Sequence, residues 1–183
     1  MTKRAIIFLA EGFEEIEAIT PIDVLRRAGV EVFVVSTTSS LEVAGAHQII
    51  IKADSLFADA NMDEADLLIL PGGMPGTNHL NAHQGLKSII THHLEKGKWV
   101  AAICAAPIIL GDMNLLTHHT VTCYPGNEKR LVGAHVSANP VEVSLPFITA
   151  RGVGAALAFS LKLVELLING DTAQDLANRM VVN

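Results

Sequence analysis

The feature that most constrains this chain is the alternation of short apolar runs with longer segments of helical periodicity. Four apolar runs occur, at residues 5–10, 30–35, 67–70 and 99–104. Uninterrupted runs of this length are typical of strands that are buried on both faces. Helical patterns lie between them at residues 14–28 and 86–96, and each is followed by a glycine. The alternation predicts an α/β fold in which right-handed crossovers connect a mostly parallel sheet.

The first helical pattern carries four large aliphatic residues and an internal proline. We expect Ile16, Ile19, Ile22 and Leu25 to lie toward one side of this helix. Pro21 predicts either a kink or a late helix start, because proline removes a backbone donor.

Two segments interrupt the alternation, and two helices close the chain. Residues 41–53 resemble a hairpin added to the sheet, and residues 135–149, with two prolines, resemble short strands joined by turns. The last helices are expected at residues 154–169 and 171–182. Because no repeat and no flexible linker is present, we expect residues 1–183 to form a single domain.

Composition narrows the class of protein and its partners. The chain has 183 residues, half of them hydrophobic, which is enough to bury a core and argues against disorder. It carries 13 basic and 19 acidic residues, for a net charge of −6, which argues against nucleic acid and anionic membrane surfaces as partners. The N-terminal apolar run is too short for a signal peptide, and no stretch reaches membrane-spanning length. We therefore expect a cytoplasmic protein.

Ligands of open parallel sheets bind beyond the carboxyl ends of the strands, so we expect the functional residues in the loops that follow the apolar runs. Cys104 ends the fourth run, and Pro107 suits the first turn of a following helix. A thiol at a helix start is favoured as thiolate, the nucleophilic form. Burial as a structural cysteine is an equally good interpretation of this turn alone.

Two other loops belong to the same predicted edge. Gly72 and Gly73 leave backbone N–H groups accessible, which together with the N–H of Ala105 would form an oxyanion hole, although a plain tight turn explains the glycines too. Four glutamates, Glu11, Glu14, Glu15 and Glu17, open the first helix. Helix-dipole interactions account for most of them, and one pointing into the cleft would serve as a general acid or base.

Together these segments resemble the ThiJ/PfpI superfamily, in particular its branch of the parkinsonism-associated protein deglycase and its bacterial relatives. The resemblance covers nearly the whole chain and rests on five segments in the family's order: AEGFEEIE at residues 10–17, DVLRRAG at 23–29, LPGG at 70–73, AAICAAP at 101–107 and TARGVG at 149–154. It implies a flavodoxin-like three-layer α/β sandwich and a homodimer.

The resemblance also implies roles for individual residues. It identifies Cys104 as the nucleophilic or oxidisable cysteine and Glu17 as the glutamate that hydrogen-bonds it. Gly73 and Ala105 match the backbone donors. Arg27 and Arg151 match basic positions near the site and the dimer contact.

The sequence departs from the family at three positions. Ala105 stands where some members have a histidine after the cysteine, which removes a Cys-His dyad. Tyr124 replaces a histidine found in many members of this branch, and tyrosine is a poor base near neutral pH. His47 aligns with an arginine.

The remaining histidines and the second cysteine carry weaker signals. His79 and His83 are spaced for metal chelation on a helix, but nothing completes a metal motif, so we expect surface histidines and no metal. His79 follows the glycine loop closely enough to reach a substrate. Cys123 is most simply a strand residue, with a resolving thiol as the alternative.

Three functions follow from these residues, in order of preference. The first is a cofactor-independent cysteine enzyme acting on reactive carbonyls, either by glyoxalase-type conversion of methylglyoxal or by deglycation of proteins. The second is a redox-sensing or chaperone-like stress protein whose Cys104 is oxidised without turnover. The third is a thiamine-related pathway enzyme, for which no thiazole or phosphate site is evident.

Overall fold

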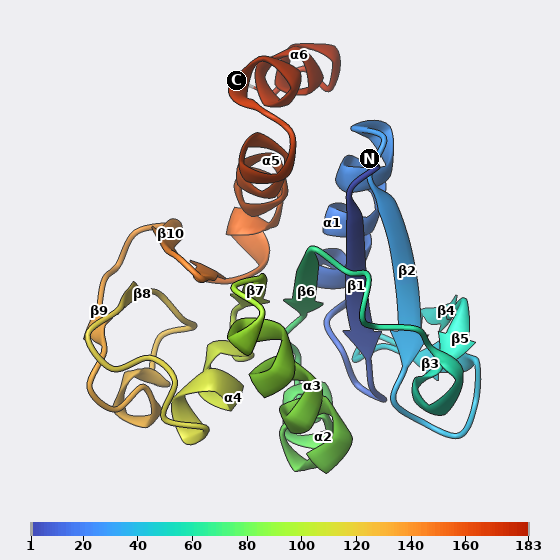
Figure 1. Cartoon of the computed structure of the whole chain (residues 1–183), viewed down its shortest axis with the longest axis vertical. Helices are drawn as coiled ribbons and strands as arrows, with labels where there is room; N and C mark the ends of the chain where they lie inside the picture. The colour runs from blue at the N-terminus through green and yellow to red at the C-terminus, as the bar shows by residue number, and fades with distance from the viewer. Residues whose placement is uncertain (1, 183) are drawn as a thin grey trace.

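A computed structural model, which describes residues 2–182, shows a central sheet between two layers of helices (Figure 1). The sheet has seven strands in the order β10-β11-β7-β6-β1-β2-β5, and every neighbouring pair is parallel except β10 and β11. Its strands are β1 (Arg4–Leu9), β2 (Glu31–Ser36), β5 (Ser55–Leu56), β6 (Leu67–Leu70), β7 (Trp99–Ile103), β10 (Val141–Ser144) and β11 (Phe147–Ala150). The predicted α/β sandwich with a mostly parallel sheet is confirmed.

Each face of the sheet has its own hydrophobic core. Alternate residues of β1 point to opposite faces, so Ile7 and Leu9 join one core while Ile6 and Phe8 join the other. The first core packs against α1 (Glu15–Arg27), α5 (Ala156–Leu167) and α6 (Gly170–Arg179). The second packs against α2 (Gly76–Ala82), α3 (Gln84–Glu95) and α4 (Pro107–Asp112). Figure 1 shows α5 and α6 leading to the end of the molecule where the C-terminus lies.

The predicted inner face of α1 is wrong in part. Ile22 and Leu25 are buried, but Ile16 and Ile19 are 52% and 38% exposed. Steps of three residues rotate about 60° short of a full turn, so positions 16, 19, 22 and 25 spread around half the helix. The buried stripe instead includes Ala18 and Pro21, at the spacing i, i+3, i+4 and i+7 with Ile22 and Leu25. Pro21 lies within the helix and neither delays its start nor ends it.

The two interrupting segments contain the expected strands, with one correction to each. The hairpin of β3 (Glu42–Ala44) and β4 (Ile50–Lys52) forms a separate two-stranded sheet and does not extend the main one. In the later segment, β8 (Thr120–Val121) pairs with β9 (His135–Val136), whereas β11 lies beside β7 within the main sheet. Three single-turn helices complete the described chain: η1 (Phe57–Asp59), η2 (Glu128–Arg130) and η3 (Val153–Ala155).

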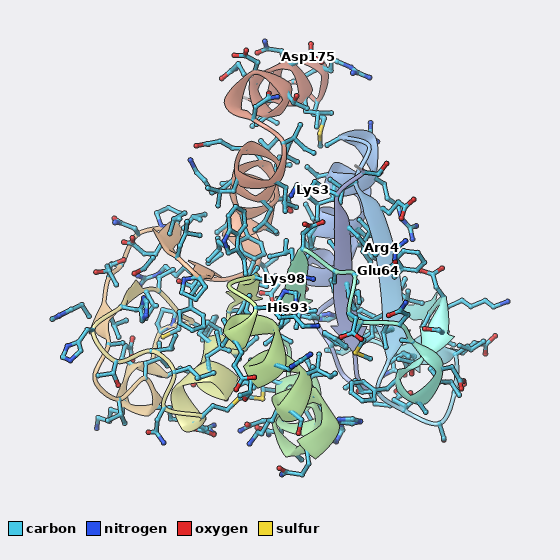
Figure 2. All side chains as sticks on the ribbon, viewed as in Figure 1. Lys3, Arg4, Glu64, His93, Lys98 and Asp175 are labelled. Atoms are coloured by element: carbon cyan, nitrogen blue, oxygen red, sulfur yellow. The ribbon has the colours of Figure 1, made fainter. Side chains whose placement is uncertain are left out.

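Charged side chains gather where β1 begins, at the edge of the sheet opposite Cys104. Lys3 pairs with Asp66 at 3.1 Å, and Arg4 pairs with Glu31 at 3.0 Å and with Glu64. Figure 2 shows Lys3, Arg4 and Glu64 at this edge.

Within residues 2–182, no helix has the length and apolar character needed to cross a membrane.

Candidate functional site

Cys104 lies on a strained turn between β7 and α4. Its φ is +64°, an uncommon value for a residue with a side chain that costs on the order of 1–3 kcal/mol. The turn is held because the Cys104 N–H donates to the backbone oxygen of Ala150 over 2.8 Å. Pro107 begins α4, as predicted. The turn therefore places Cys104 at the carboxyl edge of the sheet.

Glu17 lies beside Cys104, across the glycine loop. It is fully buried in the first turn of α1, and its Oε2 accepts a hydrogen bond from the Gly72 N–H over 3.0 Å. A Cβ added at Gly72 would lie 2.5 Å from Glu17 Oε2 and 2.8 Å from Cys104 Cβ. Glu17 Oε1 is buried and has no hydrogen-bond partner within residues 2–182. The absent side chain at Gly72 thus lets the carboxyl and the thiol approach each other.

Burial and proximity tie the protonation of Glu17 to that of Cys104. Burial raises the pKa of Glu17 to about 7, although the Cys104 thiol and the Gly72 N–H oppose this shift. Burial, followed by the neighbouring Glu17 carboxylate, also raises the pKa of Cys104. Burial and Glu17 therefore outweigh the lowering of the Cys104 pKa that was expected from the start of α4. Thiolate is favoured only when Glu17 holds the proton, because the repulsion between the two charges is then absent.

Two backbone donors face the cysteine. The N–H groups of Ala105 and Gly73 interact with the thiol and oppose the rise in its pKa. Gly73 has a φ of +89°, which directs its amide in a way that residues with a Cβ rarely allow. Gly72 does not supply a third donor, because its N–H is already bound to Glu17.

The other glutamates of the acidic loop have structural contacts. Glu14 is the N-cap of α1 and accepts the Glu17 N–H over 2.7 Å. Glu15 holds the β3–β4 hairpin by accepting the backbone N–H of His47 over 2.6 Å, and its Oε2 lies 2.8 Å from His47 Nδ1. Burial opposes ionisation of Glu15, but the bonds from His47 outweigh it and lower its pKa.

Within residues 2–182, Glu14, Glu15 and His47 form the one group whose ligand atoms lie close enough to hold a cation, within 4.8 Å of one another. The contacts just described already engage all three side chains, so no ion is needed to explain their proximity.

His79 and His83 do not form a chelating pair. His79 Nδ1 lies 2.9 Å from the Glu11 backbone oxygen, while His83 lies between α2 and α3 and accepts the Leu86 N–H.

A cleft of about 470 Å³ opens beside Cys104. It is lined by Tyr124, Pro125, Pro140, Arg151, Gly152, Val153, Gly154 and Ala155. A Cβ at Gly152 would lie 3.5 Å from Tyr124 Cδ2 and 4.0 Å from Cys104 Sγ, so the cleft adjoins the sulfur. The Tyr124 N–H donates to the Cys104 backbone oxygen over 2.7 Å, which fixes the position of this wall.

Arg27 lies at the far end of α1, and Cys123, expected as a strand residue, lies two residues after β8. Arg27 is in the last turn of α1, about 15 Å along the helix from Glu17, and its Nε donates to Asp23 over 2.7 Å. Within a single chain Arg27 therefore lies away from Cys104, and its expected place at a dimer contact stays a prediction. Cys123 is a buried free thiol that packs in the α4 core, whereas Cys104 packs in the α1 core. Burial raises the pKa of Cys123 to about 11, which is typical of a structural cysteine.

Four residues that line the cleft were not predicted from the sequence as site residues: Gly152, Val153, Pro125 and Pro140. Gly152 and Val153 belong to a segment that the family resemblance rests on, which is the one signal pointing to them. The prolines lie in irregular loops, where periodicity gives no information about spatial neighbours.

Comparison with known proteins places these features in one family. The model of the DJ-1/PfpI family matches residues 3–166. Protein dj-1beta of Drosophila melanogaster is 33% identical over 184 residues, covering 100% of this chain and 98% of that protein. DJ-1 homolog B of Arabidopsis thaliana is 35% identical over 183 residues, but the 99% of this chain that aligns spans only 42% of that longer protein.

Two further relatives bear on chemistry. A protein of Pyrococcus abyssi named Deglycase PYRAB04690 is 31% identical over 166 residues, which cover 90% of this chain and 99% of that protein. The solved structure of oxidised DJ-1 from Toxoplasma gondii is 32% identical and superposes with a TM-score of 0.94 over 98% of each chain.

Proposed function

Because this chain belongs to the DJ-1/PfpI family, we propose that it is a cysteine-dependent enzyme that converts small reactive carbonyl compounds without a cofactor. The juxtaposition of Cys104 and Glu17 carries the proposal. A strained cysteine beside a buried carboxyl of raised pKa combines a nucleophile with a proton carrier.

The first step is addition of Cys104 to an aldehyde. Proton transfer from Cys104 to Glu17 gives the thiolate, and Sγ then forms a bond to the aldehyde carbon. The carbonyl π electrons move to oxygen, which the N–H groups of Gly73 and Ala105 stabilise. Glu17 returns the proton to that oxygen, and the product is a hemithioacetal.

Methylglyoxal requires only an internal redox step after this addition. Glu17, again ionised, moves the proton from the former aldehyde carbon to the neighbouring ketone carbon through an enediol, while the hydroxyl proton on the former aldehyde carbon passes to the former ketone oxygen. The product is a lactoyl thioester on Cys104, which water hydrolyses to lactate and the free thiol. The aldehyde carbon is oxidised and the ketone carbon is reduced, so the balance needs water alone.

Deglycation uses the same site. The Pyrococcus relative named as a deglycase supports this variant of the proposal. Cys104 would take the carbonyl fragment from an early adduct, forming the C–S bond while the C–N bond breaks and the amine leaves with the thiol proton. The free amine and the hemithioacetal are the products.

Loss of methylglyoxal and formation of lactate test the proposal. Cys104→Ala should abolish both, whereas Cys123→Ala, which removes the buried thiol of the other core, should retain most of the activity. Equal rates for wild type and Cys104→Ala would overturn the proposal.

Redox sensing is the second candidate, and the oxidised Toxoplasma relative favours it. Two molecules of peroxide would each transfer one oxygen atom to Cys104, releasing water and leaving a sulfinate hydrogen-bonded to protonated Glu17. Intact-mass measurement after mild peroxide treatment should show a gain of two oxygen atoms that Cys104→Ala eliminates. A protein that resists peroxide would contradict this candidate.

We also propose a homodimer that acts in the cytoplasm. Ile16 and Ile19 on α1, with Ile49 and Ile50 on the hairpin, expose apolar surface suited to a second copy. A cytoplasmic site keeps the two free cysteines reduced. Light scattering should give a dimer mass for the wild type and a monomer mass for Ile16→Glu with Ile19→Lys. A monomeric wild type would contradict the dimer.

A further inference from the structure

The cleft beside Cys104 combines apolar walls with a single basic side chain. Tyr124 and Val153 are 54% and 39% exposed, and Pro125 and Pro140 add rigid apolar surface. At about 470 Å³, the cleft is larger than a three-carbon aldehyde requires. Its walls are suited to a flat or branched apolar body attached to the reacting carbonyl.

Arg151 is the basic side chain of this cleft, and its charge is not neutralised by an ion pair. The other arginines, Arg4, Arg26, Arg27, Arg130 and Arg179, each pair with a carboxylate. Arg151 has no carboxylate within 4.0 Å among residues 2–182. The pKa of Glu128 is lowered mainly by the backbone N–H groups of Glu128 and Gly126, the latter at 2.9 Å, and only in smaller part by the charge of Arg151.

The backbone beside Arg151 adds positive potential. The single turn η3 and then α5 begin at the cleft, and neither has a side chain capping its N-terminus. The dipole of α5 therefore points its positive end at the same cleft that Arg151 lines. Apolar walls, one guanidinium and a neighbouring nucleophile are complementary to a ligand with an apolar body, one anionic group and an electrophilic carbon.

We propose that this cleft is a substrate subsite selecting carbonyl compounds that carry an apolar body and a carboxylate, with Arg151 as the specificity-determining residue. This inference rests on the proposed function for its reacting carbonyl. The carboxylate binds the guanidinium, the apolar body lies between Tyr124 and Val153, and the aldehyde carbon reaches Cys104 Sγ. Addition of the thiol is reversible: the S–C bond forms and the thiol proton passes to the carbonyl oxygen.

Calorimetric titration with two aromatic aldehydes tests the subsite. The probes are 4-formylbenzoate and its methyl ester, which share the ring and the aldehyde but differ in charge. The wild type should bind the carboxylate at least about tenfold more tightly than the ester, as expected for a charge-assisted bond. Equal affinities would overturn the proposal.

Matched arginine variants assign the preference. Arg151→Met should reduce the ratio of the two affinities to the small remainder that the α5 dipole supplies, about two- to threefold, and Arg27→Met, on the distant end of α1, should leave the ratio unchanged. Arg151→Lys should restore part of the preference, because it keeps the charge without the planar fork. An undiminished preference in a folded Arg151→Met protein would contradict the role of Arg151.

The Cys104→Ser variant separates the subsite from the proposed chemistry. Without the thiol it should bind both probes more weakly but keep the preference for the carboxylate. If the wild type fails to convert methylglyoxal yet this preference persists, the subsite stands and the carbonyl-converting function falls. If methylglyoxal is converted and neither probe is preferred, the subsite falls alone.

Discussion

The Gly72 N–H donates to Glu17 Oε2 over 3.0 Å, and this bond joins the loop after β6 to the first turn of α1. These two segments come together beside Cys104, at the carboxyl edge of the sheet. The bond holds the carboxyl of Glu17 toward the thiol, and it stabilises the ionised form of a group whose burial favours the neutral one. Gly72 therefore both positions Glu17 and leaves the space in which it meets Cys104.

Gly72→Ala should disable the site while leaving the fold largely intact. The new Cβ would lie 2.5 Å from Glu17 Oε2, 2.8 Å from Cys104 Cβ and 3.0 Å from the Ile103 oxygen, so all three must shift. We expect a destabilisation of about 1–3 kcal/mol and a loss of about 100-fold in kcat/KM for methylglyoxal. Thermal unfolding and the methylglyoxal assay measure these effects.

Gly170→Ala is the control, because no atom lies within 4 Å of a Cβ at that position. It should retain the wild-type activity. Wild-type activity in Gly72→Ala would show that the close approach of Glu17 and Cys104 is unnecessary.

His93 should make the fold less stable in mild acid. Figure 2 shows His93 near Lys98, and burial followed by the charge of Lys98 lowers the pKa of His93 to about 4. The unfolded state, with a pKa near 6.5, binds the proton first as the pH falls. The free energy of unfolding should therefore drop between about pH 6.5 and 4, by roughly 2–3 kcal/mol at most.

Urea unfolding at several pH values measures this slope. In His93→Leu the free energy of unfolding should depend less on pH, although the variant also loses the hydrogen bond between Nε2 and the Trp99 oxygen. His92→Leu, at the exposed neighbouring position, should keep the pH dependence of the wild type. A slope that is the same in wild type and His93→Leu would assign the acid sensitivity to other groups.

Glu15 should control the opening of the β3–β4 hairpin. Its carboxylate accepts backbone and side-chain bonds from His47, and Gln cannot accept through both atoms of its amide. In Glu15→Gln, hydrogen exchange at the hairpin amides should become about tenfold faster. Glu42→Gln, an exposed change on the hairpin itself, should not alter the exchange. Unchanged protection in Glu15→Gln would contradict this anchoring role.

The strands of the main sheet were largely predictable because their burial on both faces leaves a continuous apolar signal. Residues 67–70, for example, form β6 with the expected bounds. The inner face of α1 was less predictable: residues 14–28 contain enough aliphatic side chains for two overlapping stripes, and contacts with α5 and the sheet select one of them. The membership of β11 in the main sheet depends on a long-range pairing with β7 that local sequence does not encode.

The sequence indicated which loops form the site, but it did not indicate which side chains of those loops contact one another. Strand ends placed Cys104 and the glycine loop at one edge, and the family resemblance selected Glu17 among the four glutamates. Burial and the Glu17 carboxylate raise the pKa of Cys104, and together they outweigh the lowering of that pKa that the sequence predicted from the start of α4. Arg27 matched the family motif, but it lies in the last turn of α1, where its side chain pairs with Asp23.

The pH dependence of kcat/KM for methylglyoxal tests most directly whether Cys104 and Glu17 act as one unit. Because the pKa of Glu17 is about 7, the wild-type rate should rise as the pair loses its first proton near that pH and then level off. Glu17→Gln should remove this inflection and lower the plateau by about 100-fold or more. An inflection near pH 7 and a wild-type plateau in Glu17→Gln would contradict the account, because the thiol would then act without its carboxyl partner.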